Sequence, residues 1–369
     1  MVVAFHRFGH LALEPEVFLS LKEFRTTSHS TTQQFPKVFR WWSFGPKRMR
    51  ANRYLAKKWE EQVFELPSWC IDALIRTGEK FPWMKLDTPK LSVHGPANAL
   101  DNSGAHLYFS RSELIAGRTG LEELGVDSDK PIVCLVVRDK GYYASRGEAE
   151  SQGYELFNFD ISTFVPAAKS LVARGFQVVR MGTGSDEPFG AEIPCVFDYA
   201  KSRHRSEFLD IYLAAHCAFA VSTQTGPDAV CLAFRRPVCY IDVARFSQFF
   251  FGSKLAYWNP SELQRDGKRL TLREIVSGDV VWIKDPNDFK RLGVSSIRST
   301  PVEIEQLVVG FADLFEHELT MAPHDQELSK RAQEIIETGM GGRGFETFGR
   351  ITAQLNPAFL QLHGEWFLK

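Results

Sequence analysis

The residues from Val221 to Pro227 have the composition of an anion-binding turn. They follow an apolar run, precede a helical pattern, and combine small hydroxyl side chains with a glycine. Such a turn leaves backbone N–H groups free, and the dipole of the following helix adds partial positive charge. We therefore predict a diphosphate site, whose residues are Ser222, Thr223, Gln224, Thr225 and Gly226. The alternative is a capped helix start that binds no ligand.

The dipeptide Gly9-His10 is the second candidate for chemistry. The sequence predicts a strand over Val2–Phe5 and a turn at Gly9, where a glycine lets the chain turn tightly and a substrate approach the backbone. An imidazole with an ordinary pKa of about 6.5 suits proton transfer at neutral pH. His10 is therefore a candidate general base, and a structural histidine is the alternative.

Three arginines occupy the edge of the sheet where phosphates should lie. Arg138 and Arg180 end apolar strands, and Arg205 precedes a helix. A guanidinium group stays charged and matches phosphate oxygens in geometry. We assign Arg138 to the diphosphate. For Arg180 we favour an ion pair with Asp139 or Asp160, while Arg205 binds a phosphate or faces water.

Several short segments resemble known binding motifs but lack residues or a context that those motifs require. The run Gly182-Thr183-Gly184 lacks a third glycine and is followed by Pro188, so it is no dinucleotide fingerprint. The acidic run Asp127–Asp129 precedes a strand and is interpreted as a turn. No P-loop, HExxH motif or GxSxG elbow occurs, and we predict no metal and no cofactor.

The elements that must position these residues alternate between strands and helices. The predicted strands are 132–137, 176–179, 195–197, 218–221 and 238–241, and the predicted helices are 162–173, 206–215, 227–234 and 301–315. This alternation is typical of βαβ units and a parallel sheet. The sequence therefore predicts an α/β fold of two lobes facing a central cleft.

The remaining segments are assigned from capping and composition. We predict a helix beginning near Pro15, a loop over 26–34, irregular chain over 80–105, and a helix from Ser110 to about Leu124 that begins with a capping box. The expected organisation is an N-terminal lobe (1–125), a C-terminal lobe (126–335) and a helical segment (336–369) that packs across both lobes.

Composition narrows the classes of function. The chain has 369 residues, 44% apolar and 24% charged, with a net charge of −1, which disfavours bulk binding of nucleic acid. There is neither a long apolar span nor a signal-peptide pattern. The six cysteines form no CxxC pair and are typical of a reducing compartment, so we expect a cytoplasmic protein.

The segment 40–58 contains seven Lys or Arg residues and no acidic residue. We interpret it as a solvated helix face. A second possibility is peripheral contact with anionic lipid at the inner face of the cell membrane, with Trp41, Trp42 and Trp59 as interfacial rings. Nucleic-acid binding is a third possibility that the balanced charge weakens.

A family resemblance adds to these interpretations. Thr225-Gly226-Pro227, with Pro237 ten residues later, resembles the phosphate loop of the bacterial heptosyltransferases, although Ala229 replaces a histidine of that loop. Much of residues 5–245 also resembles a bacterial family of glycosyltransferases. The matching stretches are 7–16, 136–139 with Tyr142, 180–182, 198–199, 205–211, and Asn158 with Asp160 from 153–160.

This resemblance implies a GT-B fold, in which two Rossmann-like lobes hold a nucleotide-diphospho-sugar between them. It implies a metal-independent, inverting glycosyltransferase of surface-carbohydrate synthesis, such as capsule or lipopolysaccharide, that acts on a glycan or lipid-linked acceptor. Gly9 would lie on the acceptor side, and His10 stands where heptosyltransferases have a catalytic aspartate. Tyr199 and Asp198 would hold the nucleotide base and ribose. The alternatives are a nucleotide-sugar epimerase and a non-catalytic glycan- or phosphate-binding module.

Overall fold

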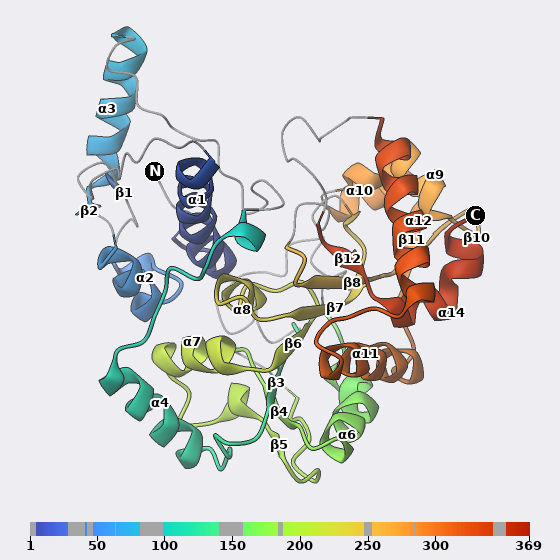
Figure 1. Ribbon diagram of the computed structural model, residues 1–369, viewed down its shortest axis with the longest axis horizontal. Coiled ribbons are helices and arrows are strands. Elements are labelled where there is room, and N and C mark those ends of the chain that lie inside the picture. The colour runs from blue at the N-terminus through green and yellow to red at the C-terminus, as the bar shows by residue number, and fades with distance from the viewer. Residues whose placement is uncertain are drawn as a thin grey trace.

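The structure is a computed structural model of the chain (Figure 1). It describes residues 5–28, 41–42, 47–62, 64–81, 99–139, 158–183, 187–246, 253–283, 285–341 and 352–369. Several predictions from the sequence lie outside these ranges. They concern the strand predicted over Val2–Phe5 (except Phe5), most of the predicted 26–34 loop, residues 82–98 of the irregular segment, Tyr142 and residues 153–157.

A parallel sheet of seven strands forms the centre of the described chain. Its strands are β3 (Ile132–Val136), β4 (Gln177–Arg180), β5 (Val196–Phe197), β6 (Phe219–Ser222), β7 (Val238–Val243), β8 (Ala256–Pro260) and β12 (Gln354–Leu355). The order across the sheet is β12-β8-β7-β6-β3-β4-β5. Numbered from β3, the first six strands follow the order 3-2-1-4-5-6, which is that of the Rossmann fold. The α/β prediction is confirmed.

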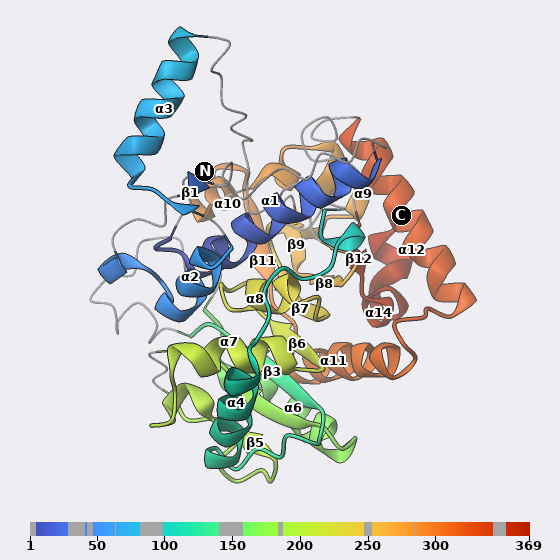
Figure 2. The same cartoon turned by 60° about the vertical axis from the view of Figure 1, so that its left-hand side comes forward.

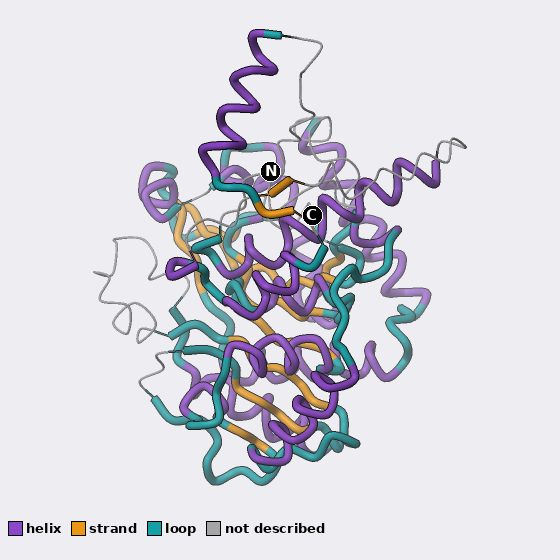
Figure 3. The backbone as a smooth tube through the Cα atoms, turned by 90° about the vertical axis from the view of Figure 1, so that its left-hand side faces the viewer, coloured by secondary structure: helices purple, strands orange, loops and turns teal. Residues whose placement is uncertain are grey.

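Helices cover both faces of this sheet, which is why β3 and β7 are buried throughout and mostly apolar. The helices α7 (Glu207–His216) and α8 (Asp228–Ala233) pack on one face, and α6 (Val165–Ala173) and α11 (Pro301–Glu316) on the other (Figure 1). The C-terminal helices α12 (Pro323–Met340) and α14 (Pro357–Phe367) pack on each other, and α14 also packs on α11. The tube in Figure 3 shows the strands lying between these helices.

Side-chain caps fix where several helices begin. Ser110 and Glu113 form the predicted capping box of α4 (Arg111–Glu123). The same arrangement begins α9 (Leu272–Ser277), α10 (Pro286–Arg291) and α11, whose N-caps are Thr271, Asp285 and Thr300. Short 3-10 turns complete the helical elements: η2 (Lys47–Met49), η4 (Leu100–Asn102), η6 (Ile161–Phe164), η7 (Tyr199–Lys201) and η9 (Val280–Trp282).

The first helix, α1 (Phe8–Ser28), begins earlier than the sequence predicts and has Pro15 in its interior. A proline there cannot donate to the carbonyl oxygen four residues before it. That oxygen belongs to Leu11, and it accepts a hydrogen bond of 2.9 Å from Trp59 Nε1. The missing helix bond is therefore replaced by a tertiary one. Gly9 and His10 lie in the first turn of α1, where the sequence predicted a turn after a strand.

The N-terminal third differs from the expected second Rossmann-like lobe. Among its described residues the strand pairing is that of β1 (Trp41–Trp42) with β2 (Phe64–Glu65), and the rest is mostly helical. The helix α1 packs on α8, while α2 (Arg53–Glu60) and α4 pack on α7. Helix α3 (Ser68–Lys80) stands away from the body of the molecule (Figures 1 and 2). The proposed boundary near residue 126 stays a prediction.

A small antiparallel sheet follows β8. It consists of β9 (Glu262–Arg265), β10 (Lys268–Arg269) and β11 (Val294–Ile297) in the order β10-β9-β11. Our predictions missed it because its strands are short, polar and half exposed, so they carry no apolar run.

Candidate functional site

The predicted anion-binding residues lie where the strand order of the sheet reverses. Strands β3 and β6 are neighbours at this switch point, and ligands of open α/β sheets bind beyond the carboxyl ends of such strands. Hydrogen bonds join the two strand ends. Thr223 N donates to Val136 O (3.2 Å), and Arg138 N donates to Thr223 Oγ1 (3.2 Å). Arg138 and the 222–226 loop are thereby placed side by side.

A buried carboxylate that the sequence analysis missed holds this loop from within. Asp228 accepts hydrogen bonds from Ser222 Oγ (2.5 Å) and Thr225 N (2.8 Å). The N–H groups of Thr223 and Thr225 are therefore both occupied, and the expectation that the turn leaves its N–H groups free is wrong for these two. The signal in the sequence was the S-x-x-x-x-x-D spacing at the strand end, in which an acidic residue begins a helix.

Burial raises the pKa of Asp228 to about 6. The hydrogen bonds from Ser222 and Thr225 and the positive charge of Arg138 act in the opposite direction but do not offset the loss of hydration. Asp228 is therefore a titratable group that is hydrogen-bonded to two of the loop residues that we assign to a ligand.

Two other backbone N–H groups of the loop are available to donate to a ligand. Within the part of the chain that the structure describes, the N–H groups of Gln224 and Gly226 have no acceptor. Gln224 adopts a left-handed backbone conformation with φ of 62°. The Thr225 hydroxyl oxygen is buried and has no partner among the described residues. The loop thus presents unsatisfied polar groups at the switch point.

The N-terminus of α1 lies directly against this loop. A Cβ built on Gly226 would lie 3.1 Å from Gly9 N, and one built on Gly9 would lie 3.4 Å from Gly226 Cα. Both residues are glycine where the backbones touch, as a close approach requires. Among the described residues, no acceptor is recorded for the N–H groups of Phe8, Gly9 and His10.

These contacts correct the predicted source of the helix dipole. The helix α8 has six residues, whereas α1 has 21 and its positive end faces the loop. The structure therefore brings together Gly9, His10 and the 222–226 loop, as the sequence analysis expected, but supplies the helix N-terminus from the other end of the chain.

The His10 side chain is 28% exposed and lies in the first turn of α1. Its Nδ1 is 2.7 Å from Glu14 Oε1, one turn further along the helix. The carboxylate of Glu14 is largely buried. His10 directly follows Gly9, whose backbone contacts Gly226 of the loop.

Arg205 lies just before α7 and pairs with Asp210, at 2.8 Å from Nη2 to Oδ2. Burial raises the pKa of Asp210, whereas the charge of Arg205 lowers it. The predicted contact of Arg205 with a phosphate therefore stays a prediction, in competition with this ion pair.

The predicted role of Tyr199 in holding a nucleotide base is wrong. Tyr199 is fully buried, and its hydroxyl donates to Asp210 Oδ1 (2.9 Å) and contacts Ser206 O (3.1 Å). Asp198 Oδ2 accepts from Phe189 N (3.0 Å) and from Arg180 Nη1 (3.4 Å). Both side chains are bound within the fold, because the 3-10 turn η7 directs them inward.

Arg180 forms the ion pair that the sequence analysis favoured. Its guanidinium is fully buried, and Nη2 lies 2.8 Å from Asp139 Oδ2. Asp160, the other predicted partner, caps the 3-10 turn η6 instead. Arg180 is thus a structural residue between β3, β4 and β5.

A second buried carboxylate, Asp242 in β7, was also missed. It accepts from Ser299 N (3.0 Å) and Ser299 Oγ (2.7 Å), and burial raises its pKa to about 6. Arg298 next to Ser299 lies over the ring of Phe159 at 4.1 Å. These residues tie the start of α11 to the carboxyl end of the sheet.

The basic segment 40–58 is less solvated than predicted. Lys58 is buried against Glu113, Arg50 pairs with Glu60, and Arg53 pairs with Glu207. Trp59 is fully buried, so it cannot serve as an interfacial ring. Lys47 and Lys57 are exposed, whereas Arg40 lies outside the described residues. Three of the basic residues in this segment therefore pair with acidic partners in the fold.

Among the described residues, no cluster of His, Cys, Asp or Glu has the spacing of a metal site, and no helix is long and apolar enough to cross a membrane. Residues 127–130 form the predicted turn, in which Asp127 Oδ1 accepts from Asp129 N.

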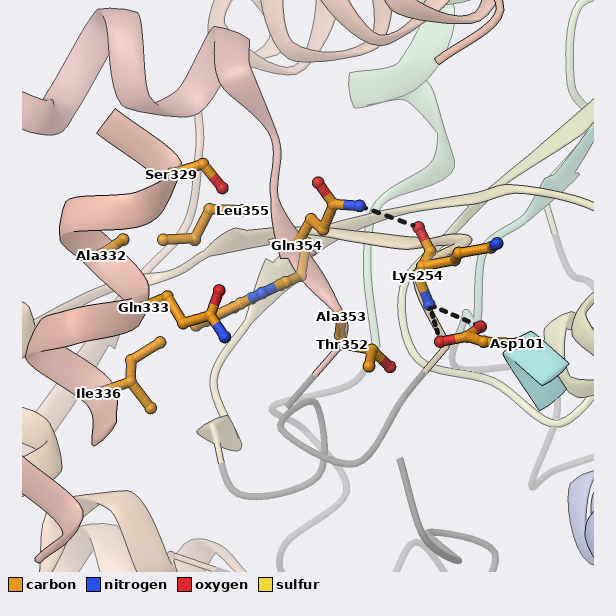
Figure 4. A pocket seen from close by; sticks show the side chains of 11 residues that line it. Asp101, Lys254, Ser329, Ala332, Gln333, Ile336, Thr352, Ala353, Gln354 and Leu355 are labelled. Carbon is orange, nitrogen blue, oxygen red and sulfur yellow. Dashed lines mark hydrogen bonds between the residues drawn. The ribbon is translucent and has the colours of Figure 1, made fainter. Parts of the chain in front are cut away.

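A pocket of about 300 Å³ lies elsewhere, at the β8–β12 side of the sheet (Figure 4). Lys254, Gln354 and the helix α12 line it, together with Asp101, whose carboxylate accepts from Lys254 N. It includes none of the predicted site residues.

Comparisons with known proteins are sparse. No protein-family model matches the chain, and no curated protein matches it. A glycosyl transferase family 9 structure from Veillonella parvula is 11% identical with a TM-score of 0.38, covering 68% of this chain and 82% of that one. The ADP-heptose LPS heptosyltransferase II of E. coli is 14% identical with a TM-score of 0.35, covering 65% and 83%. Similarity this low carries no functional argument.

Proposed function

We propose that this protein is a glycosyltransferase that moves a sugar from a nucleotide-diphospho-sugar to a hydroxyl group of an acceptor. The observation that carries the proposal is the contact between the N-terminus of α1 and the 222–226 loop at the switch point of the sheet. Five backbone N–H groups without an acceptor in the described chain gather there: those of Phe8, Gly9, His10, Gln224 and Gly226.

A diphosphate suits this set of donors. Peptide N–H groups and the positive end of a 21-residue helix favour anions, and Arg138 adds a full positive charge beside the loop. The donors would also stabilise the negative charge that grows on the diphosphate as its bond to the sugar breaks. This is why we propose that the reaction needs no metal ion.

His10 supplies the second requirement, a base near the anomeric carbon. The acceptor hydroxyl would attack from the face opposite the leaving group and give its proton to the imidazole, which inverts the configuration. The sequence resemblance supports a role in surface-carbohydrate synthesis, with a glycan or lipid-linked acceptor.

Thermal unfolding in the presence of nucleotides tests the proposal. We expect one nucleoside diphosphate to raise the unfolding midpoint by several degrees at about 100 times its Kd, and the matching monophosphate to raise it less. The nucleotide sugar with that base is then tested for transfer by following release of the diphosphate. Absence of stabilisation by any of the adenosine, guanosine, uridine and cytidine diphosphates would contradict the proposal.

A further inference from the structure

Glu14 and His10 are on consecutive turns of α1, so their side chains lie on the same face of the helix. Glu14 Oε1 is 2.7 Å from His10 Nδ1, a distance typical of a charge-assisted hydrogen bond. The Glu14 residue is 8% exposed, whereas the imidazole is 28% exposed. The pair therefore has a buried acidic end and an accessible imidazole end.

This hydrogen bond determines which ring nitrogen carries the proton of a neutral imidazole. An ionised carboxylate only accepts hydrogen bonds, so Nδ1 must be the donor. The second nitrogen, Nε2, then has a lone pair and no proton. Among the residues that the structure describes, no other partner of the His10 ring is recorded.

Because the His10–Glu14 pair adjoins the proposed diphosphate site in the chain, the tautomer of His10 bears on the proposed proton transfer. His10 follows Gly9, whose backbone touches Gly226 in the proposed diphosphate site. We propose that Glu14 is a positioning residue that holds His10 in the Nδ1–H tautomer, with Nε2 ready to accept a proton. This inference rests on the proposed function, because it assigns the proton to the acceptor hydroxyl.

The step balances without a further reactant. The acceptor oxygen forms a bond to the anomeric carbon as the bond from that carbon to the diphosphate oxygen breaks, and its electron pair leaves with the nucleoside diphosphate. The hydroxyl proton moves to His10 Nε2. The resulting imidazolium keeps its Nδ1–H bond to Glu14, whose negative charge stabilises it.

The decisive variant is Glu14→Gln, which keeps the shape of the side chain. Its amide can donate to Nδ1 as well as accept from it, so the proton is no longer held on Nδ1, and the fraction of His10 protonated on Nε2, the nitrogen that the reaction needs unprotonated, should rise. Glu23→Gln is the matched control, because Glu23 is on the same helix and its carboxylate lies 3.4 Å from a different histidine, His106.

The test is ¹⁵N NMR of histidine-labelled protein at pH 8, where ordinary imidazoles are neutral, with His10→Gln to assign the His10 signals. We expect the Nδ1–H tautomer in the wild type and in Glu23→Gln, and a raised fraction of Nε2–H in Glu14→Gln. With donor and acceptor, Glu14→Gln should lower kcat at least tenfold and leave the Kd of the nucleoside diphosphate unchanged.

Two results would overturn the inference: an Nε2–H tautomer in the wild type, or a tautomer that Glu14→Gln does not change. The tautomer is read without substrate, so it decides the role of Glu14 even if no sugar is transferred. Lack of transfer by the wild type, in contrast, would count against the proposed function alone.

Discussion

Gly9 in α1 and Gly226 after β6, 217 positions apart in the chain, are in backbone contact. A methyl group on Gly226 would lie 3.1 Å from Gly9 N and 3.1 Å from Phe8 Cβ, whereas one on Gly9 would be at ordinary contact distance, 3.4 Å from Gly226 Cα. The contact places the N–H groups of the helix end beside those of the loop. We infer that the geometry of the proposed diphosphate site depends on this contact.

Alanine substitutions at these glycines should therefore have unequal effects. Gly226→Ala must displace the α1 N-terminus by a few tenths of an ångström, so we expect a loss in diphosphate affinity of about tenfold, or ~1.4 kcal/mol. Gly9→Ala should cost less. Gly104→Ala is the control, because its Cβ meets no atom within 4 Å. Calorimetric titration measures all three, and equal affinities would show that the contact does not shape the site.

The two buried aspartates predict a pH dependence of stability. Asp228 and Asp242 have ordinary pKa values of 3.8, which burial raises to about 6 in the folded state. The folded protein therefore binds more protons than the unfolded chain between these values, and the free energy of unfolding falls as the pH rises from about 4 to 6. Each group contributes at most about 3 kcal/mol to this fall.

The variant Asp242→Asn should remove half of that dependence without touching the 222–226 loop. Denaturant unfolding at pH 4.5 and pH 7 measures it, with Asp129→Asn in an exposed turn as the control. A pH dependence that is the same in Asp242→Asn and the wild type would mean that the burial of Asp242 has no energetic consequence.

Pro15 and Trp59 should be energetically coupled. Trp59→Phe removes the donor to Leu11 O, the carbonyl that Pro15 leaves without a helix bond, and should destabilise the protein by about 1–3 kcal/mol. In the Pro15→Ala background the alanine N–H can donate to Leu11 O, so the same change should cost less. A double-mutant cycle by denaturant unfolding checks this, and additive effects would argue against the replacement of one bond by the other.

Tyr199 should matter for stability and not for nucleotide binding. Tyr199→Phe leaves Asp210 without one of its donors inside the fold, so we expect a loss of about 1–2 kcal/mol in the free energy of unfolding. The Kd of the nucleoside diphosphate should not change. A weaker affinity with unaltered stability would restore the role in base binding that the burial of Tyr199 contradicts.

The sequence predicted most strands of the central sheet and several helix starts well, because long apolar strands and capped helices are local signals. The strands β3, β4, β6 and β7 and the capping box at Ser110 were all predicted to within a few residues. The small sheet of β9, β10 and β11 was not, since its strands are short and polar. The start of α1 was placed too late, because a proline is favoured in the first turn of a helix and is disfavoured in its interior unless another donor, here Trp59, replaces the missing bond.

The candidate site, too, was predicted in part. That Gly9 and His10 lie near the 222–226 loop was expected from the family resemblance, although a helix N-terminus positions them where a turn after a strand was predicted. The roles of Asp228 and Glu14 did not, because a carboxylate's partners depend on tertiary contacts. Tyr199 was assigned to a ligand because the sequence does not reveal which side of a turn faces the core.

The central claim is that a diphosphate is bound jointly by the backbone N–H groups of the α1 N-terminus and of the 222–226 loop, beside the point where the two segments are in contact. The most direct measurement is an amide NMR titration of the ¹⁵N-labelled protein with the nucleoside diphosphate that stabilises it, compared with its monophosphate. We predict saturable shifts of the Gly9, His10, Gln224 and Gly226 amides that are larger for the diphosphate. Binding of the diphosphate that leaves these four amides unshifted would contradict the account.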